Sequence, residues 1–199
     1  MPLVAVSQDY MLNQWGTNEG TYASLHTAYS ATGTNEVSGG SYARQAITWS
    51  SASGGTLNLA STPYSFSIPS STTVAFLGFW TASSGGTFQG MTPLGGASGY
   101  AFAVPSSTGV FLAPGSSYSA GQTVVAFANG GAALPSGLTA GTIYYVISPS
   151  TDTFELSATS GGSAISLSGD GSGIITAITA EAFVSSGTYS LNSASWTIT

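Results

Sequence analysis

His26 and the serine two positions before it are the residues whose types come closest to nucleophilic chemistry. His26 is the only side chain expected to titrate near neutral pH, because the sequence holds one histidine and no cysteine. Ser24 and Asp9 could complete a Ser-His-Asp arrangement, in which the histidine takes the serine proton. Serine is abundant throughout the sequence, so this spacing carries little weight. We expect a structural or exposed histidine.

The acidic residues are the other groups that could act chemically, and they are scattered: Asp9, Glu19, Glu36, Asp152, Glu155, Asp170 and Glu181. Without a second histidine or ligand-like spacing, we expect no transition-metal site and no cofactor, while one Ca²⁺ held partly by backbone carbonyls stays open. Cleavage of a glycan would need two acids converging across a cleft. We therefore expect no enzyme, with a cell-wall glycan hydrolase as the enzymatic alternative.

Arg44 is the sole strong cation, because the chain contains no lysine. A carboxylate such as Glu36 is a natural partner for its guanidinium group, and an outward-facing strand residue is the alternative. If Arg44 bridged to an acid of a neighbouring subunit, Arg44→Ala would weaken assembly more than folding. Glu36 and Arg44 are therefore candidate assembly residues.

Three tyrosines offer a binding surface of another kind. Exposed aromatic rings on a Ser/Thr-rich β surface can stack on sugars, and Tyr118, Tyr144 and Tyr145 could form such a glycan contact. Alternating core positions explain the same residues, so both interpretations stay open.

The composition limits the classes of partner. Only 4% of the residues are charged, whereas 42% are hydrophobic and 12% aromatic, which argues for packed cores rather than disorder. A net charge of −6 with a single basic residue cannot neutralise phosphates, so nucleic acid and anionic membranes are poor partners. The chain has no cysteine for disulfides.

One helix is expected, near the start of the sequence. Apolar residues from Leu3 to Trp15 fall near helical spacing, and Gly16 follows where a C-cap would stand. We expect this segment to anchor the chain to other subunits through Val4, Met11 and Trp15. The opening residues lack the features of a signal peptide, and no apolar run is long enough to span a membrane.

Segments rich in Thr, Val, Ile, Tyr and Phe alternate with turn residues along the rest of the chain, which predicts β-strands. The expected strands of the first half are Tyr22 to Thr27, Tyr42 to Trp49, Thr56 to Leu59, Tyr64 to Ile68 and Thr72 to Trp80. The nearly continuous apolar run TTVAFLGFW predicts a strand covered on both faces at the centre of a sheet.

The pattern of strands and turns changes near residue 113, which predicts a second module. Short segments such as QTVVAFA, GTIYYVIS, DTFELSA, SAISLS and GIITAIT are divided by tight turns. The expected organisation is all-β: a sandwich or barrel-like domain with a short N-terminal helix (residues 1–112), an inserted small β domain (113–180), and C-terminal strands returning to the first domain (181–199).

Several stretches carry a resemblance to a known family. They are ASLHT, NEVSGGSYARQAITW, IPSSTTVAFLGFW with GGTF after it, and the closing SGTYSLNSASWTIT. Together they resemble a family of small virion structural proteins of tailed phages that infect actinobacteria, of capsid-decoration, minor tail or tail-fibre type. The segment LPSGLTAGTIYYVISPSTDTFELSATSGGSAISLSGDGSG is similar to a mobile β module of phage tail and decoration proteins.

The resemblance implies a structural role in the virion. A β-rich chain with almost no charge to protect its strand edges is expected to pack against other subunits, as a homotrimer or another small ring. A capsid-decoration protein that binds the major capsid protein and stabilises the assembled shell is the first hypothesis. A minor tail or tail-fibre protein that contacts tail proteins and host-surface glycan is the alternative.

Overall fold

The computed structural model describes residues 3–96, 99–105 and 108–198 and is built almost entirely of β-strands. The chain divides into two compact units, Met1–Thr92 with Glu181–Thr199 (unit 1) and Pro93–Ala180 (unit 2). The expected all-β fold with one short N-terminal helix is confirmed.

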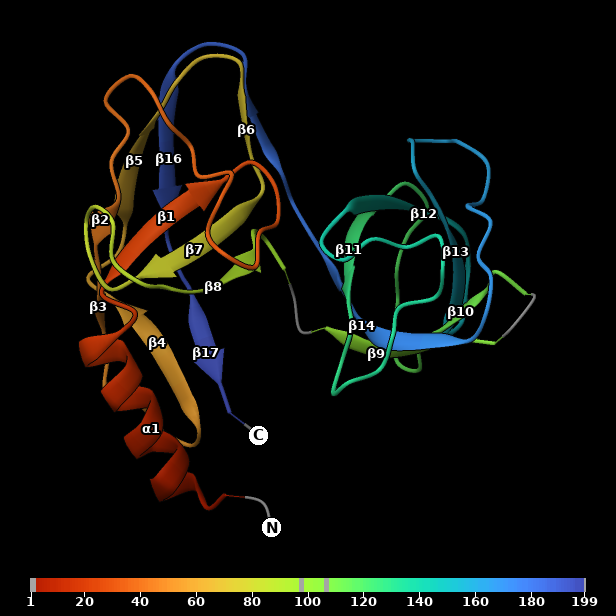
Figure 1. Ribbon diagram of the computed structural model, residues 1–199, viewed down its shortest axis with the longest axis horizontal. Coiled ribbons are helices and arrows are strands. Elements are labelled where there is room, and N and C mark those ends of the chain that lie inside the picture. Colours follow the sequence, from red (N-terminus) through yellow and green to blue (C-terminus); the bar gives the residue numbers. More distant parts are fainter. Residues whose placement is uncertain (1–2, 97–98, 106–107, 199) are drawn as a thin grey trace. The chain divides into compact units, whose positions relative to one another are not determined.

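Unit 1 contains the helix and small sheets (Figure 1). Its elements are α1 (Ala5–Asn18), β1 (Tyr22–His26), β2 (Gln45–Ala46), β3 (Thr48–Trp49), β4 (Thr56–Ala60), β5 (Tyr64–Ile68), β6 (Thr72–Val74), β7 (Phe76–Trp80), β8 (Phe88–Pro93), β15 (Glu181–Phe183), β16 (Gly187–Leu191) and β17 (Ser195–Thr197). The strands pair in the orders β2-β1-β7-β8, β17-β4-β3, β15-β6 and β16-β5. The chain therefore closes unit 1 with its last strands.

Strand β7 lies at the centre of unit 1. All five of its residues are buried, and it pairs with β1 from Tyr22↔Trp80 to His26↔Phe76. Such burial on both faces is what a continuous apolar run predicts. The expected strand from 72 to 80 is interrupted at Ala75, whose N–H donates to the His26 carbonyl at 2.9 Å.

The expected strand from Tyr42 to Trp49 is present as two short strands in two different sheets. β2 pairs with β1, whereas β3 pairs with β4. Between them the Ile47 N–H donates to the Thr21 carbonyl at 2.9 Å. Because the chain changes sheets here, Arg44 lies in the loop before β2 and not within a strand.

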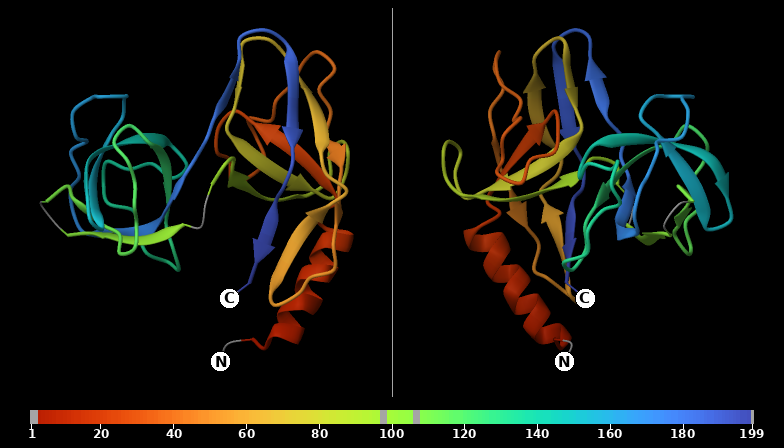
Figure 2. Two further views of the ribbon diagram at one scale, coloured as in Figure 1. Left: turned by 180° about the vertical axis from the view of Figure 1, so that it is seen from behind. Right: turned by 45° about the vertical axis from the view of Figure 1, so that its right-hand side comes forward.

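Helix α1 runs alongside β4 (Figures 1 and 2). The prediction that Gly16 caps the helix is wrong, because the helix continues to Asn18 and Glu19 is its C-cap. Gly16 instead permits a close approach: a Cβ there would lie 3.0 Å from Leu57 Cδ2 and 3.1 Å from Trp49 Cδ1. Four aromatic rings, Trp15, Trp49, Phe79 and Trp196, pack beneath the helix with centroid separations of 5.3 to 5.7 Å.

Unit 2 is a closed barrel in the order β10-β13-β12-β11-β14-β9. Its strands are β9 (Tyr100–Val104), β10 (Phe111–Leu112), β11 (Thr123–Phe127), β12 (Ile143–Ser150), β13 (Thr153–Ser157) and β14 (Gly171–Ala177). Its core includes Phe102, Phe111 and Phe154, with the last two rings stacked at 5.1 Å. The stretch SAISLS forms only isolated bridges, at Ala164 and Ser168, rather than a strand.

The chain passes from unit 1 into unit 2 between Thr92 and Pro93, and it returns to unit 1 between Ala180 and Glu181. We expected the inserted domain to begin at residue 113, but β9 and β10 belong to the barrel, where Leu112 pairs with Ala103. The barrel closes only with these two strands, so the change in sequence pattern near residue 113 lies inside unit 2 and does not mark its beginning. At its base the Thr179 N–H donates to the Leu94 carbonyl at 2.7 Å.

Candidate functional site

Arg44 is held by its own chain in unit 1. Its Nε and Nη2 donate to the Glu36 carboxylate, with the closest contact at 2.7 Å, and its Nη1 donates to the carbonyls of Ala82 at 3.1 Å and Gly85 at 2.7 Å. The guanidinium carbon lies 3.5 Å from the centroid of the Trp80 ring. The side chains of Arg44 and Glu36 are only 10% and 21% exposed. Planar, forked hydrogen bonding over an aromatic face is chemistry that arginine provides and lysine does not.

This geometry bears on the expectation that Arg44 bridges to a neighbouring subunit. The partner suggested by the sequence, Glu36, is present within the same chain, and the guanidinium has hydrogen bonds on all three nitrogens. The charge of Arg44 is therefore already paired within the chain, without an acid from another subunit. We call Arg44, Glu36, Trp80 and the carbonyls of Ala82 and Gly85 the Arg44 cluster. It holds loops of unit 1 against the sheet that contains Trp80.

Ser24 and His26 do meet, but as part of a buried network. Ser24 Oγ lies 2.7 Å from His26 Nε2, and His26 Nδ1 lies 2.9 Å from the Thr34 carbonyl. Since a carbonyl only accepts, Nδ1 carries the proton and Ser24 donates to Nε2. The Ser24 oxygen in turn accepts from Trp80 Nε1 at 2.9 Å.

This pair differs from a hydrolytic site in two respects. Ser24 and His26 are both 0% exposed, so a substrate has no access to the hydroxyl. Asp9 is engaged elsewhere, because its carboxylate accepts from the Gly55 N–H at 2.7 Å. Burial lowers the pKa of His26 below its usual value, an effect opposed by its bond to Thr34 and the nearby Glu36. The arrangement joins β1 to β7 as a neutral hydrogen-bond relay.

The helix residues expected to mediate assembly fall into two groups. Val4 is 68% and Met11 48% exposed, and Val6 and Tyr10 are exposed beside them. Trp15 belongs to the aromatic cluster beneath the helix, with its ring 5.3 Å from that of Trp196 and 5.5 Å from that of Trp49. Val4 and Met11 are thus available to a partner, while Trp15 packs within unit 1.

The three tyrosines considered for glycan contact belong to the barrel. Tyr144 is 5% exposed and its hydroxyl accepts from the Thr139 N–H at 2.9 Å. The Tyr118 hydroxyl donates to the Ile175 carbonyl at 3.1 Å, and burial raises the pKa of Tyr118 to about 12. Tyr145 is half-buried in β12. For Tyr144 and Tyr118 the core interpretation holds.

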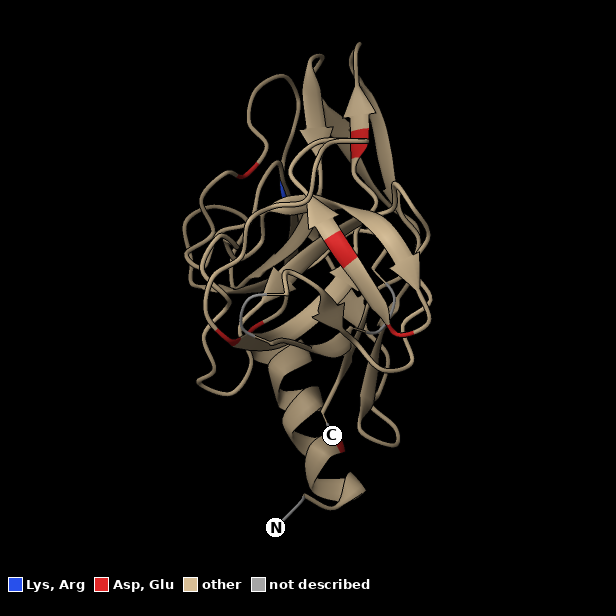
Figure 3. Ribbon diagram, turned by 90° about the vertical axis from the view of Figure 1, so that its right-hand side faces the viewer, with Lys and Arg blue, Asp and Glu red and all other residues tan. Residues whose placement is uncertain are grey.

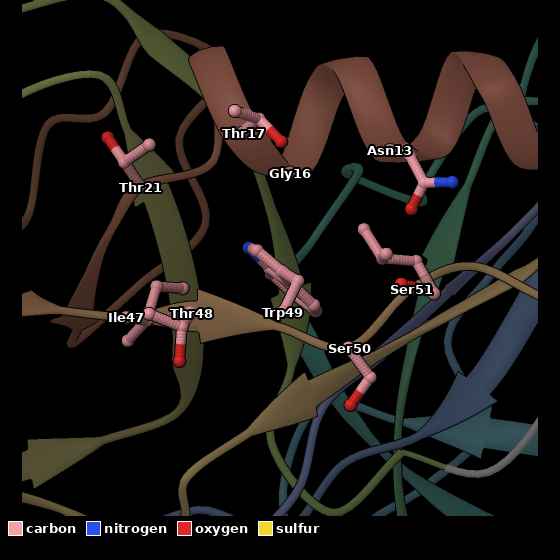
Figure 4. A pocket seen from close by; sticks show the side chains of 10 residues that line it. Asn13, Gly16, Thr17, Thr21, Ile47, Thr48, Trp49, Ser50 and Ser51 are labelled. Carbon is pink, nitrogen blue, oxygen red and sulfur yellow. The ribbon is translucent and has the colours of Figure 1, made fainter.

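A groove in unit 1 was not anticipated from the sequence. It encloses about 400 Å³ between the C-terminal half of α1 and the segment from Ile47 to Ser51. Figure 4 shows the side chain of Trp49, which belongs to this segment, below the helix that carries Asn13 and Thr17. The lining is Asn13, Gly16, Thr17, Thr21, Ile47, Thr48, Trp49, Ser50, Ser51 and Leu57, which includes no ionisable side chain.

The groove is a consequence of how the helix meets β3. Gly16 brings the helix backbone against Trp49 and Leu57, and the Asn13 side chain accepts from the Ala52 N–H at 2.8 Å. The Trp49 ring is fixed by a bond from its Nε1 to the Gly20 carbonyl at 2.7 Å. Gly16 lies two residues before the helix ends at Asn18, and its lack of a side chain permits this close approach.

Charged groups are too dispersed for a metal centre in the described part of the chain. Across residues 3–96, 99–105 and 108–198 no three His, Cys, Asp or Glu side chains gather where they could hold an ion. Figure 3 shows the acidic residues as separate segments of the ribbon. Within these same residues, no helix has the length and apolarity needed to cross a membrane.

Comparison with known families supplies the biological context. Residues 11–109, which are 99 of the 199 residues, match the family described as Podophage GP4 fiber I protein gp80. The chain is similar to a phage fiber protein. This similarity supports a phage structural protein and a virion component, as the resemblance of the sequence implies. Searches of curated proteins and of solved structures returned no match.

The matched region has a clear relation to the fold. It begins within α1, covers the strands of unit 1 from β1 to β8 but not β15 to β17, and ends in the barrel after β9. It includes the whole groove and the Arg44 cluster. The family description names a podophage fiber, and it names neither an actinobacterial host nor a capsid.

Proposed function

We propose that this chain is a structural subunit of a phage tail fibre, where it binds other virion proteins and presents its barrel as a distinct module. The observation that carries the proposal is the fiber-family match over residues 11–109, which covers most of unit 1 and only the first strand of the inserted barrel. The capsid-decoration role, our first hypothesis from the sequence, becomes the second candidate.

The surface of α1 supports an assembly role. Val6, Tyr10 and Met11 on α1, together with Leu3 and Val4 just before it, expose apolar side chains. Exposed apolar groups gathered on one element are typical of protein contact sites. We expect them to contact other virion subunits, and we expect a homotrimer or another small ring, because fibres and capsid decorations are both symmetric assemblies of repeated chains.

No catalytic role is part of the proposal. The hydroxyl of Ser24 and the ring of His26 are enclosed by the sheet. In the described residues the acids do not gather. We expect the chain to act by binding.

Capsid decoration is retained because the described chain holds one helix of 14 residues and two compact β units, which suit dense packing on a shell. Copy number and position separate the two candidates. Quantitative mass spectrometry on purified heads and tails, with antibody labelling of intact particles, is expected to find few copies and to find them on the tail. Hundreds of copies on heads would establish decoration instead, and absence from purified particles would refute both.

A further inference from the structure

The groove beneath α1 has one wall made by the free edge of a sheet. β3 is the last strand in the order β17-β4-β3. The Ser50 N–H donates to the Asn58 carbonyl at 2.9 Å, and Trp49 is opposite Leu59. Since successive residues of an antiparallel strand direct their N–H and C=O groups to opposite sides, those of Trp49 point away from β4 and toward the open edge.

This open edge is short because both of its ends are closed. On one side the Ile47 N–H donates to the Thr21 carbonyl at 2.9 Å, and on the other the Ala52 N–H donates to the Asn13 side chain at 2.8 Å. A peptide strand that extended the sheet would have to displace both contacts. The groove therefore accepts a compact ligand rather than a strand passing through it.

The lining determines the chemistry of that ligand. Hydroxyl and amide side chains (Asn13, Thr17, Ser51) line the groove together with the partly exposed Trp49, and Leu57 closes it from below as a core residue that is 1% exposed. None of the lining residues carries a charge, and the chain has a net charge of −6, so anions are disfavoured. A volume of about 400 Å³ is within the range of small-molecule sites. Neutral hydroxyl-rich rings with apolar faces fit this combination.

We propose that the groove bounded by Asn13, Thr17 and Trp49 binds a neutral carbohydrate of about one or two sugar rings. Trp49 provides a wall that is already rigid, because its ring packs on Trp15 at 5.5 Å and its N–H is tied to Gly20. A site that is ordered before binding loses little conformational entropy on binding. The inference rests on the proposed fibre role, in which a host-surface glycan is the natural source of such a sugar.

Thr17 gives the sharpest test, because it is exposed on the helix and lines the groove. Thr17→Phe fills the space without touching the core. Asn18→Phe, at the next exposed position and outside the lining, is the matched control. The full chain would be titrated with neutral disaccharides (lactose, cellobiose, maltose, di-N-acetylchitobiose) and with acidic sialyllactose, followed by saturation-transfer NMR and tryptophan fluorescence.

The expected result is saturable binding of at least one neutral sugar, weakened at least about 10-fold in Thr17→Phe and kept within about 2-fold in Asn18→Phe. No binding to the neutral panel, a preference for sialyllactose, or equal binding by Thr17→Phe would overturn the inference.

A second measurement distinguishes this outcome from failure of the fibre role. Because the chain lacks cysteine, Thr17→Cys introduces a unique thiol. Maleimide labelling of phage particles carrying this variant is expected to proceed on the tail, since a sugar site must be open there. A labelled tail without sugar binding would overturn the groove inference alone. A thiol present in the tail but protected would show that another subunit covers the groove, while absence from the particle would overturn the fibre role.

Discussion

Replacing Arg44 by alanine tests whether its cluster is a fastening within unit 1 or a link between subunits. The substitution removes the hydrogen bonds to Glu36, those to the carbonyls of Ala82 and Gly85, and the contact with the Trp80 ring. It leaves the Glu36 carboxylate, 21% exposed, without a cation. The perturbation therefore combines a lost ion pair, lost carbonyl bonds and a lost cation–π contact.

The magnitude follows from the burial of the pair. A surface ion pair contributes about 0–1 kcal/mol, whereas removing one partner of a buried pair costs about 3–5 kcal/mol. At exposures of 10% and 21% the Arg44–Glu36 pair lies nearer the buried case. Adding about 1 kcal/mol for the Trp80 contact and discounting the pair for partial solvation, we expect Arg44→Ala to lower the unfolding free energy of unit 1 by about 3 kcal/mol.

Tryptophan fluorescence provides an assay for unit 1 alone. All four tryptophans of the sequence lie in that unit: Trp15, Trp49, Trp80 and Trp196. Urea unfolding followed by emission therefore reports unit 1, and far-ultraviolet circular dichroism reports both units. Arg44→Lys keeps the charge but loses the forked geometry, so we expect it to recover only part of the loss.

The double variant of Arg44→Ala and Glu36→Gln completes the cycle. A coupling of about 1–2 kcal/mol is expected between the two positions, because they contact each other directly. If Arg44→Ala lowers the unfolding free energy by less than about 0.5 kcal/mol and also changes the oligomeric state, Arg44 does not stabilise unit 1 internally. That result would instead support a contact of Arg44 with a neighbouring subunit.

Three further perturbations follow from the same contacts. Ser24→Ala leaves Trp80 Nε1 and His26 Nε2 buried without their partner, so the unfolding free energy of unit 1 is expected to fall by about 1–3 kcal/mol in urea titrations; an unchanged midpoint would contradict the relay. Because burial depresses the pKa of His26, the unfolded chain binds a proton first as pH falls below about 6.5, and stability is expected to drop by up to about 1.4 kcal/mol per pH unit. His26→Gln should abolish this slope, and a slope that persists in that variant would assign it to other groups. Replacing the barrel by a short glycine linker between Leu94 and Thr179, which are joined by a bond of 2.7 Å, should leave the tryptophan emission and cooperative unfolding of unit 1 intact; loss of both would show that unit 1 needs the barrel to fold.

The sequence predicted those elements whose local pattern agrees with their packing. The alternating YSFSI is a strand with the expected bounds, Tyr64–Ile68, and the apolar FLGFW is buried throughout. Long-range contacts decided the rest. The segment around Ile47 is divided between two sheets because the Ile47 N–H donates to the Thr21 carbonyl. Gly16 lies within the helix, where its lack of a side chain lets the helix approach Trp49 closely. Neither partner can be recognised from nearby sequence.

The candidate sites were predictable where residue type was rare and not where common residues converge. Because Arg44 is the sole arginine, Glu36 could be predicted as its partner, and the structure shows the ion pair between them. The groove is lined by threonine, serine and asparagine, which occur throughout this sequence, so only the fold distinguishes Thr17 and Ser51 from the others. For the same reason the three tyrosines could not be assigned to core or surface until the barrel register was known.

The small number of charged residues also limits how the chain can attach to a virion. The only strong cation is engaged within unit 1, so electrostatic attraction cannot come from a free basic group on this chain. We expect attachment to use apolar contacts, such as those offered by Val6 and Tyr10 on α1, and backbone or hydroxyl hydrogen bonds. Salt screens exposed charges and leaves apolar burial intact or strengthens it. Attachment that survives molar salt follows from this surface, whereas release by salt alone would require a basic partner meeting the scattered acids.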